Sequence, residues 1–156
     1  MAYNTDIWRP HVVVATVIER DGRFLFVEED IEGRIVINQP AGHLDPGETL
    51  PAAAARETLE ETGWTVHIDQ LIGIYLLATA TPGKTFVRFA FAGTALHHDP
   101  QRRLDPEIVQ ALWFNRAELV AREPQLRTPL VLRALDDYLA GQRYPLTLLH
   151  DFLTPA

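Results

Sequence analysis

From Gly42 to Trp64 the chain reads GHLDPGETLPAAAARETLEETGW. Three glutamates in this stretch, Glu57, Glu60 and Glu61, stand at positions i, i+3 and i+4, so a helix places all three on one face. Like charges at this spacing destabilise an isolated helix. A hard divalent cation reverses that effect, because Mg²⁺ and Mn²⁺ prefer carboxylate oxygens as ligands. The stretch therefore predicts a metal site built on one helical turn.

The residues around the glutamates favour a helix. Thr49 is a suitable N-cap, Pro51 is tolerated in the first turn, and Gly63 stands where a left-handed residue ends a helix. At about 100° per residue, a second set of side chains falls opposite the glutamates. This set consists of Ala52, Ala55, Leu59 and Thr62. We expect these small or apolar side chains to pack on the core.

The stretch resembles the signature of the Nudix hydrolases, in which glycines, an arginine and several glutamates recur at fixed spacing. The seven positions of that signature that take a single residue type are filled by Gly42, Glu48, Arg56, Glu57, Glu60, Glu61 and Gly63. Each type occurs at about one position in fifteen, so seven matches arise by chance on the order of 10⁻⁸ times per start site. Thr58 departs from the pattern, where an aliphatic residue is usual, and we expect slightly weaker packing beneath the helix. A solvated acidic helix face is the alternative, but it does not explain the glycines, Arg56 and Glu48 in register.

The resemblance implies a role for each of these residues. Mg²⁺, or Mn²⁺ in its place, is expected on three carboxylates, with a backbone carbonyl completing the ligand set. The carboxylates are those of Glu57, Glu60 and Glu61, and the carbonyl is that of Ala41 or Gly42. Arg56 and Glu48 are expected to hold the loop and to orient the glutamates.

The residue that accepts the proton of the attacking water is left open. Glu57 is one candidate, and the other is a distal acid, which many members of the family have near position 107. Glu107 is the first choice for that acid and Asp105 the second, although both are equally explained as ordinary loop residues. Lys84 and Arg88 are candidates for holding a substrate phosphate, and surface charge explains them as well.

Composition restricts the class of protein further. The chain has 156 residues, no cysteine and a net charge of −7. This length favours a single domain over residues 1–156, and the lack of cysteine excludes thiolate catalysis and thiolate metal ligands. The negative charge argues against a nucleic acid polymer as partner, whereas a small phosphorylated substrate remains compatible with a bound metal. The apolar run 12–18 is too short to span a membrane, so we expect a cytoplasmic protein, either a monomer or a homodimer.

The pattern along the chain predicts an α/β fold. Asp21-Gly22 is a strong hairpin signal between the first two expected strands. Strands are expected at 12–18, 24–28, 34–38, 65–69, 71–80, 85–96 and 110–115, and helices after Thr49, at 116–122 and at 128–140. The Nudix resemblance implies an α/β/α sandwich with a mixed sheet.

Segments outside the signature resemble the NudJ phosphatase branch of the family. They are NQPAGHL at 38–44, RTPLV at 127–131 and GQRYPL at 141–146. This resemblance implies release of phosphate from thiamine pyrophosphate, hydroxymethylpyrimidine pyrophosphate and nucleoside di- and triphosphates. Arg127 and Arg143 either touch substrate or have structural roles. The alternatives are a Nudix pyrophosphatase that cuts an internal bridge in nucleotide sugars, ADP-ribose or dinucleoside polyphosphates, and a ligand-sensing domain without activity.

Overall fold

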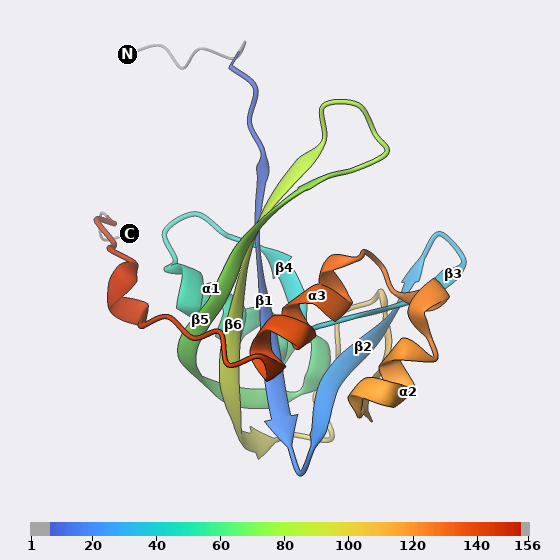
Figure 1. Cartoon of the computed structure of the whole chain (residues 1–156). Helices are drawn as coiled ribbons and strands as arrows, with labels where there is room; N and C mark the ends of the chain where they lie inside the picture. The colour runs from blue at the N-terminus through green and yellow to red at the C-terminus, as the bar shows by residue number, and fades with distance from the viewer. Residues whose placement is uncertain (1–6, 154–156) are drawn as a thin grey trace.

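The computed structural model describes residues 7–153, and within them seven strands form one sheet in the order β3-β2-β1-β6-β5, with β4 beside β1 and β7 beside β2 (Figure 1). The strands are β1 (His11–Arg20), β2 (Arg23–Ile31), β3 (Arg34–Asn38), β4 (Ala41–His43), β5 (Trp64–Ala78), β6 (Thr85–His98) and β7 (Ile108–Phe114). The helices are α1 (Leu50–Thr62), α2 (Arg116–Val120) and α3 (Leu130–Leu139), with short 3₁₀ turns at η1 (Glu123–Gln125) and η2 (Leu146–Leu148). None of the helices in this part of the chain is long and apolar enough to cross a membrane.

The sheet is mixed, as the resemblance predicted. β1 runs parallel to β6 from His11 to Ile18, whereas the other strand pairs are antiparallel. β1 is central, and its residues from Val14 to Ile18 are buried. A strand covered on both faces is typically an almost unbroken apolar run, which is what the sequence shows here.

Helices cover both faces of the sheet, so the expected α/β/α sandwich is confirmed. Alternate residues of one strand point to opposite faces, and Leu25 and Phe26 of β2 accordingly belong to different apolar cores. The core with Phe26 packs under α2 and α3, and the core with Leu25 packs under α1. In Figure 1, α3 lies in front of the sheet and α1 behind it.

The turns follow the sequence closely. Asp21 and Gly22 both have positive φ, 52° and 74°, as a two-residue hairpin turn of the primed type requires. Residues 79–84 join β5 to β6, and this hairpin extends past the end of the sheet (Figure 1). Its base contributes Leu77, Lys84 and Phe86 to the cavity described below.

Three expected elements differ from the structure. Residues 65–69 and 71–80 were expected as two strands, but β5 is a single strand with irregular pairing near Ile68 and Gln70 and again near Leu71 and Gly73. At these register shifts the alternation of apolar and polar residues is interrupted. In the sequence, such an interruption looks like the end of one strand and the start of another. Ala41–His43, where no strand was expected, pairs with β1 as β4. The third helix begins at Leu130 rather than at 128.

Of the residues expected on the buried face of α1, only Thr62 is fully buried. Its buried residues are Ala53, Ala54, Glu57, Thr58, Glu61 and Thr62, whereas Ala52 is exposed and Ala55 and Leu59 are only half-buried. The helix thus buries two of the three glutamates on the side that faces β4 and β1.

Thr58 has a role that the signature did not indicate. Its side chain is fully buried, and its Oγ1 lies 2.8 Å from the carbonyl of Ala54 and 3.2 Å from Oγ1 of Thr16 on β1. Both hydroxyls therefore have partners in the core, which is the usual condition for burying a polar group. The expected weakening of the packing is offset by this polar contact between α1 and β1.

Candidate active site

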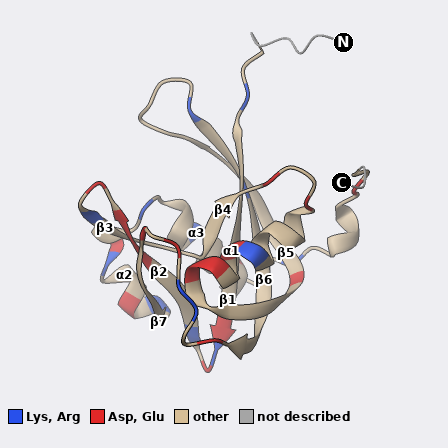
Figure 2. Ribbon diagram, turned by 180° about the vertical axis from the view of Figure 1, so that it is seen from behind, with Lys and Arg blue, Asp and Glu red and all other residues tan. Residues whose placement is uncertain are grey.

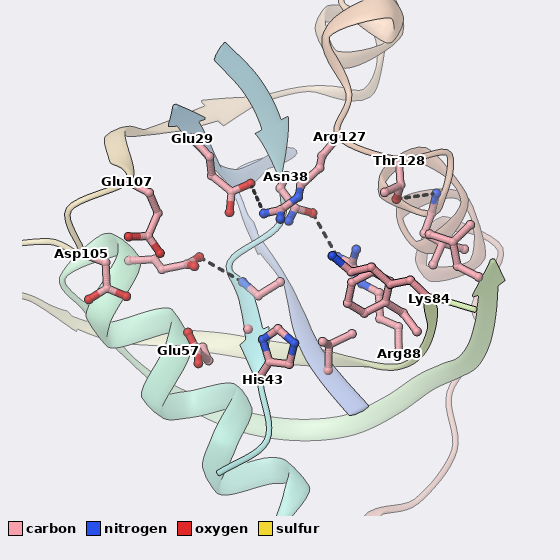
Figure 3. Close-up of a pocket in the computed structure, with 17 residues that line it drawn as sticks. Glu29, Asn38, His43, Glu57, Lys84, Arg88, Asp105, Glu107, Arg127 and Thr128 are labelled. Carbon is pink, nitrogen blue, oxygen red and sulfur yellow. Dashed lines mark hydrogen bonds and ion pairs between the residues drawn. The ribbon is translucent and has the colours of Figure 1, made fainter. Parts of the chain in front are cut away.

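The acidic turn of α1 faces a cavity of about 410 Å³. Figure 2 shows this turn from the α1 side, and Figure 3 shows the cavity. Its lining comes from β1 to β6, from α1, from the segment before β7, and from the segment that leads into α3. The polar lining residues are Glu29, Asn38, His43, Glu57, Glu61, Lys84, Arg88, Asp105, Glu107, Arg127 and Thr128.

Local chemistry determines where α1 begins and ends. Thr49 is extended at φ −76° and accepts a hydrogen bond from the backbone N–H of Ala52, which satisfies one of the free donors of the first turn. Gly63 is left-handed at φ 74°, and its N–H donates to the carbonyl of Leu59. Both caps were predicted from the sequence, and they fix the register of the glutamates relative to the sheet.

Arg56 joins the signature loop to the helix. Its Nε and Nη2 donate to the two oxygens of Glu48 at 2.9 and 2.7 Å, in the bidentate geometry that makes such pairs strong. Nη2 also donates to the carbonyl of His43. This pairing holds the pKa of Glu48 below its usual range, chiefly through the hydrogen bond from Arg56.

The same guanidinium also pairs with two of the glutamates. Nη1 of Arg56 lies 2.8 Å from Oε1 of Glu57 and 3.0 Å from Oε2 of Glu60. Arg56 is thus paired both with Glu48 of the loop and with the glutamates of the helix. Arg56 thereby orients the carboxylates and balances part of their charge.

Three carboxylates lie close enough together to share a cation. One oxygen from each of Glu57, Glu60 and Asp105 lies within 4.8 Å of the other two. The backbone N–H of Asp105 donates to the carbonyl of Glu60 at 3.1 Å, which holds the segment before β7 against the end of α1. Burial raises the pKa of Glu57 and of Asp105, and neighbouring carboxylates add to both shifts.

Gly42 has to be a glycine because Glu57 lies against it. A Cβ on Gly42 would overlap the Cδ and both carboxylate oxygens of Glu57. Gly42 lies on β4, beside Val14 of β1, so the strand brings its backbone up to the carboxylate. The glycine of the signature therefore makes room for the carboxylate.

Glu61 lies deeper than the three clustered acids. It is 3 % exposed, and its Oε2 accepts a hydrogen bond of 3.0 Å from the backbone N–H of Ala41. Burial raises its pKa to about 9; the hydrogen bond from Ala41 opposes this shift, and the negative charge of Glu29 adds to it. Glu61, Ala41 and Gly42 all line the cavity, and their roles as metal ligands stay predictions.

Glu107 lines the cavity but lies outside the cluster of three. Its backbone carbonyl accepts a hydrogen bond of 2.8 Å from the N–H of Asp30 on β2, so its position is fixed by the sheet. The second choice for the distal acid, Asp105, is the residue that joins Glu57 and Glu60. The role of Glu107 as a base stays a prediction.

The far side of the cavity is basic. Arg88 is 5 % exposed, and its Nη2 donates to Oδ1 of Asn38 and Oε1 of Gln39. Arg127 donates to Oε2 of the buried Glu29 at 2.7 Å. Lys84 extends from the β5–β6 hairpin toward the same space (Figure 3).

Sequence reasoning missed some lining residues. Glu29 stands in the run Glu28-Glu29-Asp30, and strand alternation would have placed its side chain opposite those of its neighbours. Asn38 gave no chemical signal, since amides at a strand end are common. Arg127, which was expected either to touch substrate or to have a structural role, lines the cavity. Arg143 does not line this cavity, and its guanidinium lies over the ring of Tyr138.

A comparison with protein families decides the class of this chain. The NUDIX domain profile matches residues 8–134. The chain belongs to the Nudix family. This Nudix hydrolase is 42% identical over 150 residues to phosphatase NudJ of Escherichia coli (strain K12), with 96% of each chain covered. Phosphatase NudJ of Shigella sonnei (strain Ss046) matches equally, at 42% over the same 96% of each chain.

A solved structure agrees with this assignment. A NUDIX hydrolase from Nitrosomonas europaea is 48% identical to this Nudix hydrolase, with a TM-score of 0.90 over 92% of this chain and 98% of that one. The protein is thus a phosphohydrolase of the Nudix family, and three residues of its signature, Gly42, Glu57 and Glu61, line the cavity beside α1.

Proposed function

We propose that this Nudix hydrolase releases orthophosphate from small organic pyrophosphates in a reaction that depends on Mg²⁺ or Mn²⁺. The observation that carries the proposal is the group of carboxylates from Glu57, Glu60 and Asp105, of which Glu57 and Asp105 line the cavity. The named relatives are phosphatases, which supports phosphate as the product. The proposed substrates are thiamine pyrophosphate, hydroxymethylpyrimidine pyrophosphate and nucleoside di- and triphosphates.

The donor set suits a hard divalent cation. All three clustered groups are carboxylates, and oxygen is the ligand atom that Mg²⁺ and Mn²⁺ take. Burial and the charge of neighbouring carboxylates raise the pKa of Glu57 and Asp105. A cation bound among these carboxylates would offset their repulsion, which Arg56 offsets only in part. Glu61 is a further proposed ligand from the same helix. When bound, the metal would act as a Lewis acid that offsets charge on the phosphate oxygens and activates water.

The protein's own groups then position the reaction. Arg56 holds Glu57 and Glu60 in place and ties them to the loop through Glu48. The general base is Glu57 or an acid of the segment before β7, Asp105 or Glu107. A base works best when its pKa lies near the working pH, and burial shifts Glu57 and Asp105 in that direction.

We propose the same single domain over residues 1–156, as a monomer or homodimer, with no nucleic acid polymer as partner. The net charge of −7 weighs against binding a polyanion. The net charge does not weigh against a small phosphorylated ligand, because the positive side chains on the basic wall of the cavity can interact with its phosphate directly.

The test is a product analysis by ³¹P NMR with Mg²⁺ present. Thiamine pyrophosphate, a nucleoside diphosphate, a nucleoside triphosphate and ADP-ribose are compared. The proposal predicts orthophosphate from the first three. Two phosphomonoesters from ADP-ribose, with no orthophosphate from the others, would instead assign the protein to the enzymes that cut an internal bridge. No turnover of any substrate would favour a ligand-sensing domain.

A further inference from the structure

Arg88 is a buried cation that forms no ion pair with a carboxylate in the described part of the chain. Its Nη2 donates to two neutral amide oxygens, on Asn38 at 3.3 Å and on Gln39 at 2.8 Å. Its Nε is buried and has no hydrogen-bond partner within residues 7–153. Burying a charge is unfavourable unless an anion accompanies it. Burial lowers the pKa of Arg88 to about 10, although the nearby charge of Glu29 opposes this shift, so the guanidinium is still positive at neutral pH.

Two further cations lie on the same wall and are also incompletely paired. The guanidinium of Arg127 makes one hydrogen bond within the described chain, from Nη1 to Glu29, although it has five N–H donors. The ammonium of Lys84 lies 5.4 Å from the ring centroid of Phe86, and in residues 7–153 it makes no ion pair. Among the described residues, this wall thus carries three positive charges, and only the charge of Arg127 is paired with a carboxylate, that of Glu29.

We propose that Arg127, Lys84 and Arg88 form an anion subsite that takes the terminal phosphate of the substrate. Arg127 and Lys84 donate hydrogen bonds to it, because each has free donors at the cavity. Arg88 acts through its charge from beneath, since its Nε is buried and its Nη2 is held by Asn38 and Gln39. The subsite lies across the cavity from Glu57 and Asp105 (Figure 3).

The placement of the two walls defines a substrate class. This step rests on the proposed function, in which a phosphoric anhydride is cut beside Glu57. One phosphate of the anhydride then lies at the acidic wall and the next at the basic wall. A terminal phosphate is small and carries the most negative charge, so it suits the basic end of the cavity. A substrate with an organic group on both sides of the anhydride places a larger, less charged group there and is disfavoured.

The test measures binding of inorganic phosphate to the metal-free protein, with EDTA present, by amide NMR of the ¹⁵N-labelled chain. Phosphate is expected to shift the amide signals of residues 84–88 and 126–128 in a saturable way. Arg127→Met and Lys84→Met are expected to weaken this binding about tenfold or more, as the loss of a charge-assisted hydrogen bond implies. Arg127→Lys is expected to bind with intermediate strength. Arg88 is left unchanged because a buried substitution risks unfolding.

Arg34→Met is the matched control, because Arg34 is an exposed cation at the start of β3 and lies outside the cavity lining. It is expected to bind phosphate like the parent protein. Phosphate binding that is absent, or that persists unchanged in both Arg127→Met and Lys84→Met, would overturn the subsite.

A kinetic measurement separates the subsite from the proposed function. For thiamine pyrophosphate with Mg²⁺, Arg127→Met is expected to raise KM at least tenfold with a smaller change in kcat. If no pyrophosphate is turned over while metal-free phosphate binding behaves as described, the proposed function fails and the subsite stands. If turnover occurs and Arg127→Met leaves KM unchanged, the subsite fails and the proposed function stands.

Discussion

Gly42 on β4 and Glu57 on α1 lie so close that a methyl group on the glycine would occupy the place of the glutamate carboxylate. The contact leaves no room for a side chain at this point of the strand while the Glu57 carboxylate keeps its place. It also explains why a strand residue belongs to a signature whose chemistry lies on a helix. Any side chain at Gly42 has to displace Glu57 from the cluster with Glu60 and Asp105.

Gly42→Ala is expected to lower kcat/KM by about 10²-fold, since a displacement of about 1 Å in a catalytic group has an effect of that size. Steady-state kinetics with Mg²⁺ check this. Gly33→Ala is the control: Gly33 has φ 84° in the turn after β2 and nothing within 4 Å of an added Cβ. That variant is expected to lose stability through backbone strain but to keep its kcat/KM. Equal activity in both variants would contradict the role given to the contact.

Arg56→Lys tests whether the bidentate pair with Glu48 orients the metal site. A lysine keeps the charge but cannot fork between two carboxylate oxygens and also reach Glu57 and Glu60. We expect the Mg²⁺ concentration for half-maximal activity to rise about 10–100-fold. Arg116→Lys is the matched control, because Arg116 forms an exposed bidentate pair with Asp136, at 2.6 and 3.1 Å. It is expected to change nothing in the Mg²⁺ dependence.

Glu61→Gln is expected to stabilise the metal-free protein at alkaline pH. The pKa of Glu61 is about 9 in the folded protein against an ordinary 4.5, so between these values the folded state binds more protons than the unfolded state. Stability therefore falls as pH rises through this window, and glutamine removes the loss. We expect a Tm at pH 8 higher by roughly 2–4 °C for each kcal/mol recovered, with the difference vanishing near pH 4.

Differential scanning fluorimetry in EDTA from pH 4 to pH 9 measures this effect. Glu32→Gln, in the exposed turn after β2, serves as the control and is expected to follow the parent protein. A Glu61→Gln variant that is equally or less stable than the parent at pH 8 would show that Glu61 is ionised without cost in the folded protein.

Asp105→Asn and Glu107→Gln distinguish the two distal acids. Asp105 shares the cluster with Glu57 and Glu60. Asp105→Asn is therefore expected to lower kcat by about 10²–10⁴-fold, the usual range for the loss of a general base. Glu107→Gln is measured in parallel under saturating Mg²⁺. A loss below about tenfold in Glu107→Gln would remove it as the base, and a larger loss there than in Asp105→Asn would restore it to first place.

The signature helix was predictable because its signals are local. Thr49, Pro51 and Gly63 fix its ends, and the glutamates follow from helical spacing alone. The side it buries was not predictable in this way. Periodicity assumes that carboxylates avoid the core, whereas α1 buries Glu57 and Glu61 against β4 and β1. The hydroxyl pair of Thr58 and Thr16 depends on residues 42 positions apart, and nothing in either neighbourhood indicates it.

The basic wall was only partly predictable for a related reason. Lys84 and Arg88 were candidates for holding a phosphate because they are charged. The residues that surround them could not be predicted, because these residues come from segments far away in the sequence. Arg88 is held by Asn38 and Gln39, and Arg127 pairs with Glu29, 98 positions away. Sheet order brings these residues together, and the order β3-β2-β1-β6-β5 includes a parallel pair that local patterns do not specify.

The central claim is that the carboxylates of α1 carry a metal-dependent release of orthophosphate. Its most direct test is orthophosphate release from thiamine pyrophosphate with saturating Mg²⁺, measured for the parent protein and for Glu60→Gln, with amide NMR to confirm that the variant is folded. The account predicts Mg²⁺-dependent release by the parent protein and loss of most of that activity in the folded variant. Release that needs no divalent metal, or that is equally fast in Glu60→Gln, would contradict it.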